Sequence, residues 1–296
     1  MTSPKHNLIL ESALLCLLAL LWGSSYLLIK VAVETIPPIT LIASRVFIAA
    51  IFLSAIVIWK GERLPRDGHT WRLLLVQSFL TSIGAWTVLA WGQQYVDSAL
   101  ASVLNSTSPV FVFLITFFFT RHETTSWLKF FGACMGITGV ALIVGTEALQ
   151  GLGQQVLAQL AVLSGAVMYA GAAIFGKKFT HLTPLITATC TMIWASLFLV
   201  PLSLVLDQPW TLNPSAQSML AAGTLAVLGT GVALLIYFRL LRTLGSLGTT
   251  SQSYLRAGVG VALGVIVLGE HITPVIGAGI AAALIGVIAI NFPKRA

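Results

Sequence analysis

Two polar stripes on otherwise apolar segments are the residues of this sequence best suited to chemistry. The first lies in residues 98–111, SALASVLNSTSPVF, and the second in residues 245–259, GSLGTTSQSYLRAGV. At helical spacing the polar side chains of each stripe share one face, because residues three and four apart are neighbours on a helix. The stripe residues predicted to bind a substrate are Ser102, Asn105, Ser106, Thr249, Gln252, Ser253 and Arg256.

Arg256 sets the chemistry that the stripes could perform. A guanidinium at the centre of a bilayer costs about 2.5–3.5 kcal/mol on insertion scales, so water, a counter-charge or a ligand is expected beside it. Its fork of donors suits a carboxylate or another anionic group of a substrate. We favour that binding role. A structural role, in which Arg256 binds backbone carbonyls at an interrupted helix end, is the alternative.

The paired stripes predict two helices that face one hydrated cavity, with Val110, Phe113, Leu255 and Val259 turned toward lipid. Hydrogen bonding between helices is the alternative, because Ser, Thr, Asn and Gln often join membrane helices. Deep aromatic side chains are predicted to complete the cavity wall, since a buried Trp or Tyr needs a partner for its polar atom. They are Trp22, Tyr26, Trp86, Tyr169, Tyr237 and Tyr254.

A second arginine, Arg45, lies about two turns inside another apolar segment. Its long side chain could extend to the membrane surface or pair with Glu34. We therefore interpret Arg45 as structural.

The composition indicates an integral membrane protein. Of the 296 residues 57% are hydrophobic and 8% are charged, whereas soluble domains carry about 25% charged residues. The net charge of +7 therefore does not indicate nucleic acid, and no nucleic-acid partner is predicted. The three cysteines lie in apolar segments and suggest neither disulfides nor a metal site, so no cofactor is predicted.

The positions of the titratable residues argue against other function classes. No aspartate or glutamate lies in the middle of an apolar segment, and all five histidines lie in links or at segment edges. An intramembrane enzyme needs a nucleophile with a base, or paired carboxylates, at membrane depth. Proton coupling through a buried carboxylate is disfavoured for the same reason. The sequence also lacks a P-loop, which excludes ATP-driven transport by this chain.

Ten apolar segments are long enough to cross the hydrocarbon, for which a helix needs about 20 residues. The first is expected to be retained, because no signal-cleavage pattern follows it. Of the 16 Lys and Arg residues, 13 fall on the side that holds both termini and only Lys30 falls on the other. Both termini are therefore predicted to be cytoplasmic. The segments are 10–30, 38–59, 72–93, 98–120, 127–145, 155–176, 183–206, 216–238, 246–268 and 274–292.

The chain also repeats itself. A shift of 147 residues brings Lys30 onto Lys177 and Gly84 onto Gly231, among other matches. Each half contains five spans, an odd number, so the second half must enter the membrane from the opposite side. Inverted repeats are typical of secondary transporters, whose site lies near the midplane between the halves. The predicted domains are 8–145 and 155–292.

Several short motifs resemble EamA-type members of the drug/metabolite transporter superfamily. They are LLWGSSYLLIK in the first segment, ASRVFIAA at 43–50, and the similar unit endings GACMGITGV and GAGIAAALIGV. The resemblance covers nearly the whole chain and implies an all-α polytopic membrane protein of ten transmembrane helices in two inverted five-helix repeats. By position it matches Trp22, Gly23, Arg45 and Glu270 to family residues. At Arg256 the sequence departs from the family, which usually has a proline there.

The resemblance implies a secondary transporter of the bacterial inner membrane. It would export or exchange small metabolites, such as amino acids or related anionic and amphipathic compounds, by alternating access. A homodimer through the peripheral glycine-rich helices is a further prediction, with the lipid bilayer and the small-molecule substrate as the other partners. An intramembrane enzyme and a channel are the alternatives. Recovery of chemically unchanged substrate and saturable counterflow would exclude them.

Overall fold

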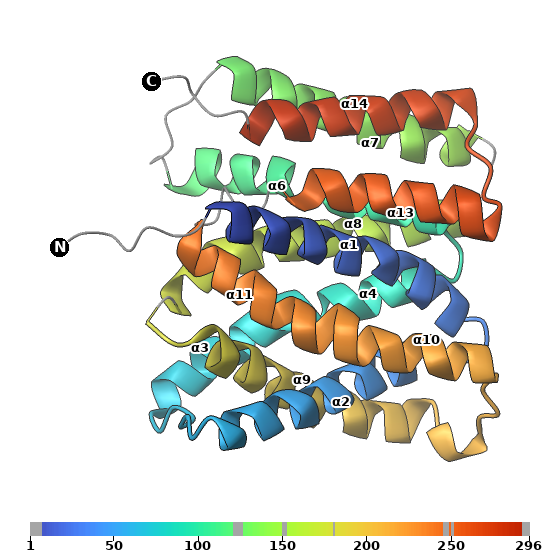
Figure 1. Ribbon diagram of the computed structural model, residues 1–296. Coiled ribbons are helices and arrows are strands. Elements are labelled where there is room, and N and C mark those ends of the chain that lie inside the picture. The colour runs from blue at the N-terminus through green and yellow to red at the C-terminus, as the bar shows by residue number, and fades with distance from the viewer. Residues whose placement is uncertain are drawn as a thin grey trace.

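The computed structural model describes residues 8–120, 127–149, 153–179, 181–244, 249 and 252–291. These residues form helices that run side by side along one direction, and within the described ranges there is no strand (Figure 1). The starts of several helices follow local sequence signals. Pro38 and Pro184 occupy the first turns of their helices, where the missing N–H is not needed. The Asp67 carboxylate accepts a hydrogen bond from the Thr70 N–H at the start of another helix.

The first half of the chain contains two continuous helices, two helical stretches that include π-helix, and a long final helix. Its elements are α1 (Leu8–Ala32), α2 (Pro38–Trp59), α3 (Gly68–Ser78), the π-helix η1 (Phe79–Ile83), α4 (Ala85–Gly92), α5 (Ser98–Ser106), α6 (Ser108–Ile115), the π-helix η2 (Thr116–Thr120) and α7 (Trp127–Leu149).

The second half follows a similar order. Its elements are α8 (Gly153–Phe175), the 3₁₀-helix η3 (Gly176–Phe179), α9 (Pro184–Leu206), the 3₁₀-helix η4 (Pro209–Thr211), α10 (Ala216–Ala226), the π-helix η5 (Val227–Val232), α11 (Ala233–Thr243), α13 (Gln252–Leu268) and α14 (Pro274–Asn291).

The predicted apolar segments coincide with single helices or with runs of consecutive helices, apart from residues 246–251, most of which lie outside the described ranges. Among the described residues, seven helical stretches are long and apolar enough to cross a membrane. Leu255–Leu268 and Pro274–Gly286 are shorter apolar helices. The all-α, membrane-spanning character predicted from the sequence is therefore confirmed, while the number of ten spans stays a prediction.

The two halves pack in matching ways. The π-helix η1 recurs as η5 about half a chain later, and π-helical turns often mark functional positions. Helix α4 packs on α8 as its equivalent α11 packs on α1, and α6 packs on α8 as its equivalent α13 packs on α1. Three further contacts join equivalent helices of the two halves: α2 with α9, α5 with α13, and α7 with α14. These matched contacts agree with the internal repeat seen in the sequence.

Helices α7 and α14 form one edge of the molecule, at the top of Figure 1, and meet through glycines. A Cβ added to Gly139 would lie 2.5 Å from the Ala283 nitrogen, and one added to Gly286 would lie 2.4 Å from the Gly136 nitrogen. The glycines therefore allow two backbones of the same chain to touch. The predicted homodimer is not tested by a single chain, but these glycine faces are already occupied within it.

Helix α1 begins and α14 ends at the same end of the bundle, on the left of Figure 1, which is called the terminal end below. The basic link 60–67 lies there too, between α2 and α3. The other end is called the opposite end.

Candidate functional site

A small buried cavity lies where α1, α2, α4, α5, α8 and α13 meet. Its volume is about 20 Å³, room for about one water molecule. Both halves of the chain line it, the second through Tyr169 and Arg256. Six of its residues were predicted from the sequence, and Ser25, Ile29, Arg45 and Leu89 join them. The full lining is Trp22, Ser25, Tyr26, Ile29, Arg45, Trp86, Leu89, Asn105, Tyr169 and Arg256.

Arg256 extends from α13 to α5, where it meets a break in the helix. Pro109 has no N–H, so the Asn105 carbonyl four residues earlier lacks its usual helical donor. The Arg256 Nη2 donates to that carbonyl at 3.2 Å and lies 3.5 Å from the Ser106 hydroxyl. The residue is 5% exposed, and its buried Nε has no hydrogen-bond partner among the described residues. The backbone contact expected of a structural arginine is therefore present, yet it leaves part of the guanidinium unsatisfied.

Arg45 is the residue that sequence reasoning misplaced. It neither extends to the membrane surface nor pairs with Glu34, but is 2% exposed inside the cavity wall. Its Nε donates to the Thr230 hydroxyl at 2.5 Å and its Nη2 to the Gly229 carbonyl at 3.3 Å. The guanidinium also lies 3.9 Å above the Trp86 ring, in a cation–π contact.

The π-helix η5 explains why Arg45 can remain at this depth. A π-helical turn disturbs the regular backbone ladder, and here the Gly229 carbonyl accepts hydrogen bonds from both Arg45 and the Trp22 indole. The available signal was a second uncompensated arginine within an apolar segment, which predicts buried partners as it does for Arg256.

The aromatic residues and Asn105 are joined by hydrogen bonds. The Trp86 Nε1 donates to the Tyr169 hydroxyl, which links α4 to α8 across the two halves. The Asn105 amide nitrogen donates to the Tyr26 hydroxyl at 2.7 Å. The buried Asn105 Oδ1 has no hydrogen-bond partner among the described residues. Within that part of the chain the cavity therefore offers an unused acceptor on Asn105 and an unused donor on Arg256.

Among the predicted site residues with described side chains, Tyr237, Thr249 and Gln252 are not part of the cavity lining. Tyr237 packs beside Trp22 in a tilted arrangement, with ring centroids 5.2 Å apart. Thr249 and Gln252 are buried toward the start of the ninth predicted segment. The side chains of Ser253 and Tyr254 lie outside the described residues.

Ser102 shows how α5 and α13 meet beyond the cavity. Its hydroxyl donates to Ala99 of its own helix and lies 3.4 Å from the Ala257 carbonyl of α13. A Cβ on Gly260 would lie 2.4 Å from the Ser102 Cβ, so the helices are in close contact there. Both interpretations of the stripes therefore apply along their length: hydrogen-bonded packing near Ser102 and a cavity near Asn105.

Two of the residues predicted to face lipid are buried instead. Val110 and Phe113 pack against α7, because Gly136 leaves room for the Val110 side chain. Val259 fills the space left by Gly23 of α1 and is half-buried. Leu255 is exposed, as predicted.

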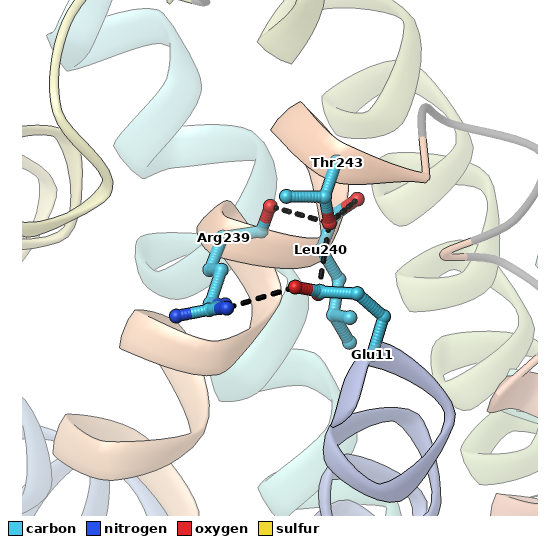
Figure 2. A network of polar contacts seen from close by, with 4 residues as sticks. All are labelled: Glu11, Arg239, Leu240 and Thr243. Atoms are coloured by element: carbon cyan, nitrogen blue, oxygen red, sulfur yellow. Dashed lines mark hydrogen bonds and ion pairs between the residues drawn. The ribbon is translucent and has the colours of Figure 1, made fainter. Parts of the chain in front are cut away.

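The charges of the site are unbalanced. Among the described residues, the cavity wall carries two guanidinium groups and no carboxylate. A carboxylate–arginine pair lies instead at the terminal end, where Glu11 of α1 accepts from Arg239 at 2.8 Å and from Thr243 at 2.9 Å (Figure 2). That pair joins α1 to α11 and leaves the cavity arginines unaffected.

At the opposite end a carboxylate caps the first polar stripe. The two Glu270 oxygens accept from the Ser98 and Ala99 N–H groups at 2.7 and 2.9 Å, at the start of α5. This position favours a negative charge because helix N-termini carry unpaired donors. Burial, together with the nearby Glu270 carboxylate, raises the pKa of Asp97. The link between α13 and α14 is thereby tied to α5.

Comparison with known proteins shows which family this chain belongs to. The EamA-like transporter family matches the chain twice, over residues 10–145 and 156–292. The chain belongs to this family. It is 27% identical over 258 residues to the uncharacterized inner membrane transporter YedA of Escherichia coli, covering 87% of this chain and 83% of YedA. It is 28% identical over 224 residues to the uncharacterized transporter YoaV of Bacillus subtilis, covering 74% and 75% of the two chains.

The fold of this EamA-type chain is also similar to that of a solved crystal structure. The TM-score is 0.66 at 18% sequence identity, over 95% of this chain and 97% of the other. Family membership and the relatives support an integral membrane protein and point to a transporter rather than an enzyme.

Proposed function

We propose that the protein is a secondary transporter that exports or exchanges small metabolites, such as amino acids or related anionic and amphipathic compounds. The substrate would bind in the central cavity, with its anionic group at Arg256. The observation that carries this proposal is the buried Arg256 guanidinium, which faces a cavity lined by both repeats and has an unpartnered Nε.

The energetics of Arg256 support a ligand at this position. Within the described residues neither of its hydrogen-bond partners is a carboxylate. A buried charge without a counter-charge costs several kcal/mol, so an anion that binds there recovers part of that cost. The free Oδ1 of Asn105 complements the arginine, because it could accept from an ammonium or hydroxyl group of the same molecule.

The cavity must widen before it can hold a metabolite, because about 20 Å³ accommodates only about one water molecule. In a secondary transporter one repeat rocks against the other around a fixed site. The contacts of Arg256 cross between the halves, so such a movement would change them directly. This is the basis for proposing alternating access.

A wider pocket at the terminal end supports access from that side. Its volume is about 600 Å³, and its wall includes Lys60, Arg239 and Arg242 together with Glu62. A pocket with excess positive charge raises the local concentration of anions. The excess of Lys and Arg in the links at this end favours a cytoplasmic location for it, so export or exchange is the proposed direction.

The proposed topology comprises ten spans in two inverted domains, 8–145 and 155–292, with both termini cytoplasmic in the bacterial inner membrane. The matched contacts of the two halves support the inversion. A membrane-impermeant cysteine reagent applied to single-cysteine variants in the links 60–67 and 207–215 tests it, since only the second link should react from outside.

The proposed function is tested by counterflow in proteoliposomes, first by screening amino acids and small organic anions. Arg256→Ala is expected to reduce exchange of the transported solute about 100-fold or more, because truncating one member of a buried, charge-assisted contact typically costs 2–5 kcal/mol. Arg66→Ala, in the exposed 60–67 link, is the matched control and should leave exchange unchanged. Unaltered affinity and rate in a folded Arg256→Ala variant would contradict the binding role.

A further inference from the structure

We propose that Arg45 is a second anion-binding residue of the central cavity, and that the substrate is therefore a compact organic acid with two anionic groups, one at each guanidinium. This inference rests on the proposed function, because it narrows the substrate class of the same cavity.

The two arginines share one cavity and neither is neutralised there. Arg45 is 2% and Arg256 5% exposed, and both line the same space. The partners of Arg45 are a hydroxyl, a backbone carbonyl and an aromatic ring. These groups solvate a guanidinium but carry no negative charge. The other residues of the lining are neutral as well.

A substrate with one anionic group would neutralise only one of these charges. The second guanidinium would remain buried beside it, where a low dielectric strengthens the effect of an unpaired charge. A substrate with two anionic groups neutralises both, and each guanidinium offers a planar fork of donors that fits a carboxylate or phosphate. The charge balance of the cavity thus favours a diacid over a monoacid.

The contacts of the two arginines cross between the repeats. Arg45 belongs to the first half and is bound by Gly229 and Thr230 of the second. Arg256 belongs to the second half and is bound by Asn105 and Ser106 of the first. A diacid that engages both guanidiniums therefore bridges the two halves at the position around which they would move.

Asn105 adds a further element of recognition. Its amide nitrogen is used by Tyr26, which leaves the buried Oδ1 as an acceptor on the cavity wall. A hydroxyl or ammonium group on the carbon chain between the two acidic groups would satisfy it. The favoured substrate is then a short diacid with one such donor.

The test compares matched solutes that differ by one charge. Purified protein in liposomes is assayed for counterflow with dicarboxylates of three to five carbons, with and without an amino or hydroxyl group. Each is paired with its mono-amide, in which one carboxylate is replaced by a neutral group of similar size. Wild type is expected to prefer the best diacid over its mono-amide by about 30-fold or more, in line with the loss of a buried charge pair.

Substitutions of Arg45 test whether this residue causes the preference for diacids. Arg45→Gln is expected to reduce the preference to about threefold or less, and mainly by weakening diacid binding. Arg45→Lys retains the charge, so it should keep the preference with lower affinity. Arg66→Gln removes an exposed charge from the 60–67 link and should behave as wild type. Size-exclusion profiles identify variants that fail to fold, and the wild-type preference decides the question if Arg45→Gln is one of them.

Each outcome has a defined meaning. Equal or better exchange of mono-amides, monoacids or neutral zwitterions by wild type would overturn the inference and leave the proposed function intact. So would a folded Arg45→Gln variant that still prefers diacids. Failure of every solute in the function screen and in this panel to exchange would overturn both.

Discussion

Two contacts between equivalent helices of the repeats differ in what fills them. Helices α7 and α14 meet through glycines. The backbone of each helix occupies the space that a Cβ of the other helix would fill. Helices α5 and α13 meet through Ser102 and Gly260 at one level and through Asn105 and Arg256 at the next. The first contact is close packing of backbone on backbone, whereas the second includes buried polar atoms that have no partner within the described part of the chain.

The two contacts therefore suit different roles, one rigid and one able to rearrange, within the same duplicated fold. Backbone-to-backbone packing has a single close arrangement, so α7 and α14 are suited to hold the repeats together. Polar side chains can exchange partners, which suits α5 and α13 to a contact that rearranges when a ligand binds. Pro109 contributes, because it lacks the N–H that would bond the Asn105 carbonyl, and Arg256 and the Ser108 hydroxyl donate to that carbonyl instead.

The largest expected effect comes from a side chain placed in the α7–α14 contact. In Gly286→Leu the new Cβ would lie 2.4 Å from the Gly136 nitrogen and 2.5 Å from the Gly132 oxygen. Neither backbone atom can rotate away, so destabilisation of about 3 kcal/mol or more is expected. Thermal unfolding in detergent and the yield of monodisperse protein measure it.

Gly223→Ala in α10 is the control for that experiment, because nothing lies within 4 Å of the added Cβ. It should leave stability unchanged or raise it by about 0.5–1 kcal/mol through helix propensity. If Gly286→Leu unfolded at the same temperature as wild type, the α7–α14 contact would not be the rigid one.

A smaller effect, and one that can be repaired, is expected in the α5–α13 contact. Gly260→Ala forces a Cβ against the Ser102 side chain rather than against backbone. We expect a loss of about 1–3 kcal/mol from overpacking. Adding Ser102→Gly removes the atoms that clash and should restore part of that loss, as a double-mutant cycle in thermal unfolding would show. Strictly additive effects would contradict the contact.

The next effect concerns Glu270, which lies in the link between α13 and α14 and accepts hydrogen bonds from the start of α5. Glu270→Gln removes the charge that two N–H groups of α5 share, and should cost about 1 kcal/mol of stability. Glu62→Gln is the control, because Glu62 accepts from the Thr183 hydroxyl in an exposed setting. Thermal unfolding of the two variants compares them, and equal small changes would show that the Glu270 cap contributes nothing.

The smallest effect is a pH dependence at Asp97. Its pKa is raised by burial and by Glu270, so the folded protein holds the proton more tightly than the unfolded chain does. The stability that the folded protein gains from a protonated Asp97 is fully present below the pKa of Asp97 in the unfolded chain. It is lost as the pH rises through the pKa of Asp97 in the folded protein. Asp97→Asn should therefore be more stable than wild type at pH 7, by less than about 1 kcal/mol for a half-buried group.

The same Asp97→Asn advantage should shrink as the pH falls through the folded pKa and vanish below about pH 3, where wild-type Asp97 is protonated in both states. Unfolding temperatures measured across this range test the sign. An advantage that grows toward low pH would mean that Asp97 is stabilised as a carboxylate, contrary to its surroundings.

Much of the fold could be predicted from the chain itself, because long apolar runs specify membrane helices and prolines mark their starts. The proximity of Arg256 to Asn105 and Ser106 was predictable too, since both stripes are polar faces at helical spacing and occupy equivalent positions in the two halves. Trp22, Tyr26, Trp86 and Tyr169 followed from their depth. These are local patterns that the sequence contains without help from distant residues.

Only the tertiary structure could place Arg45, because its partners Thr230 and Gly229 are far along the chain and the carbonyl is offered by a π-helical turn. It also decided that Ser102 packs against Gly260 while Asn105 lines a cavity, although both lie on one stripe. The sequence by itself determined which segments are apolar, which residues are polar within them, and that the pattern occurs twice. Which polar atoms remain without partners depends on how the two halves meet, since the hydrogen bonds between the halves join residues that are far apart in the chain, such as Arg45 and Thr230.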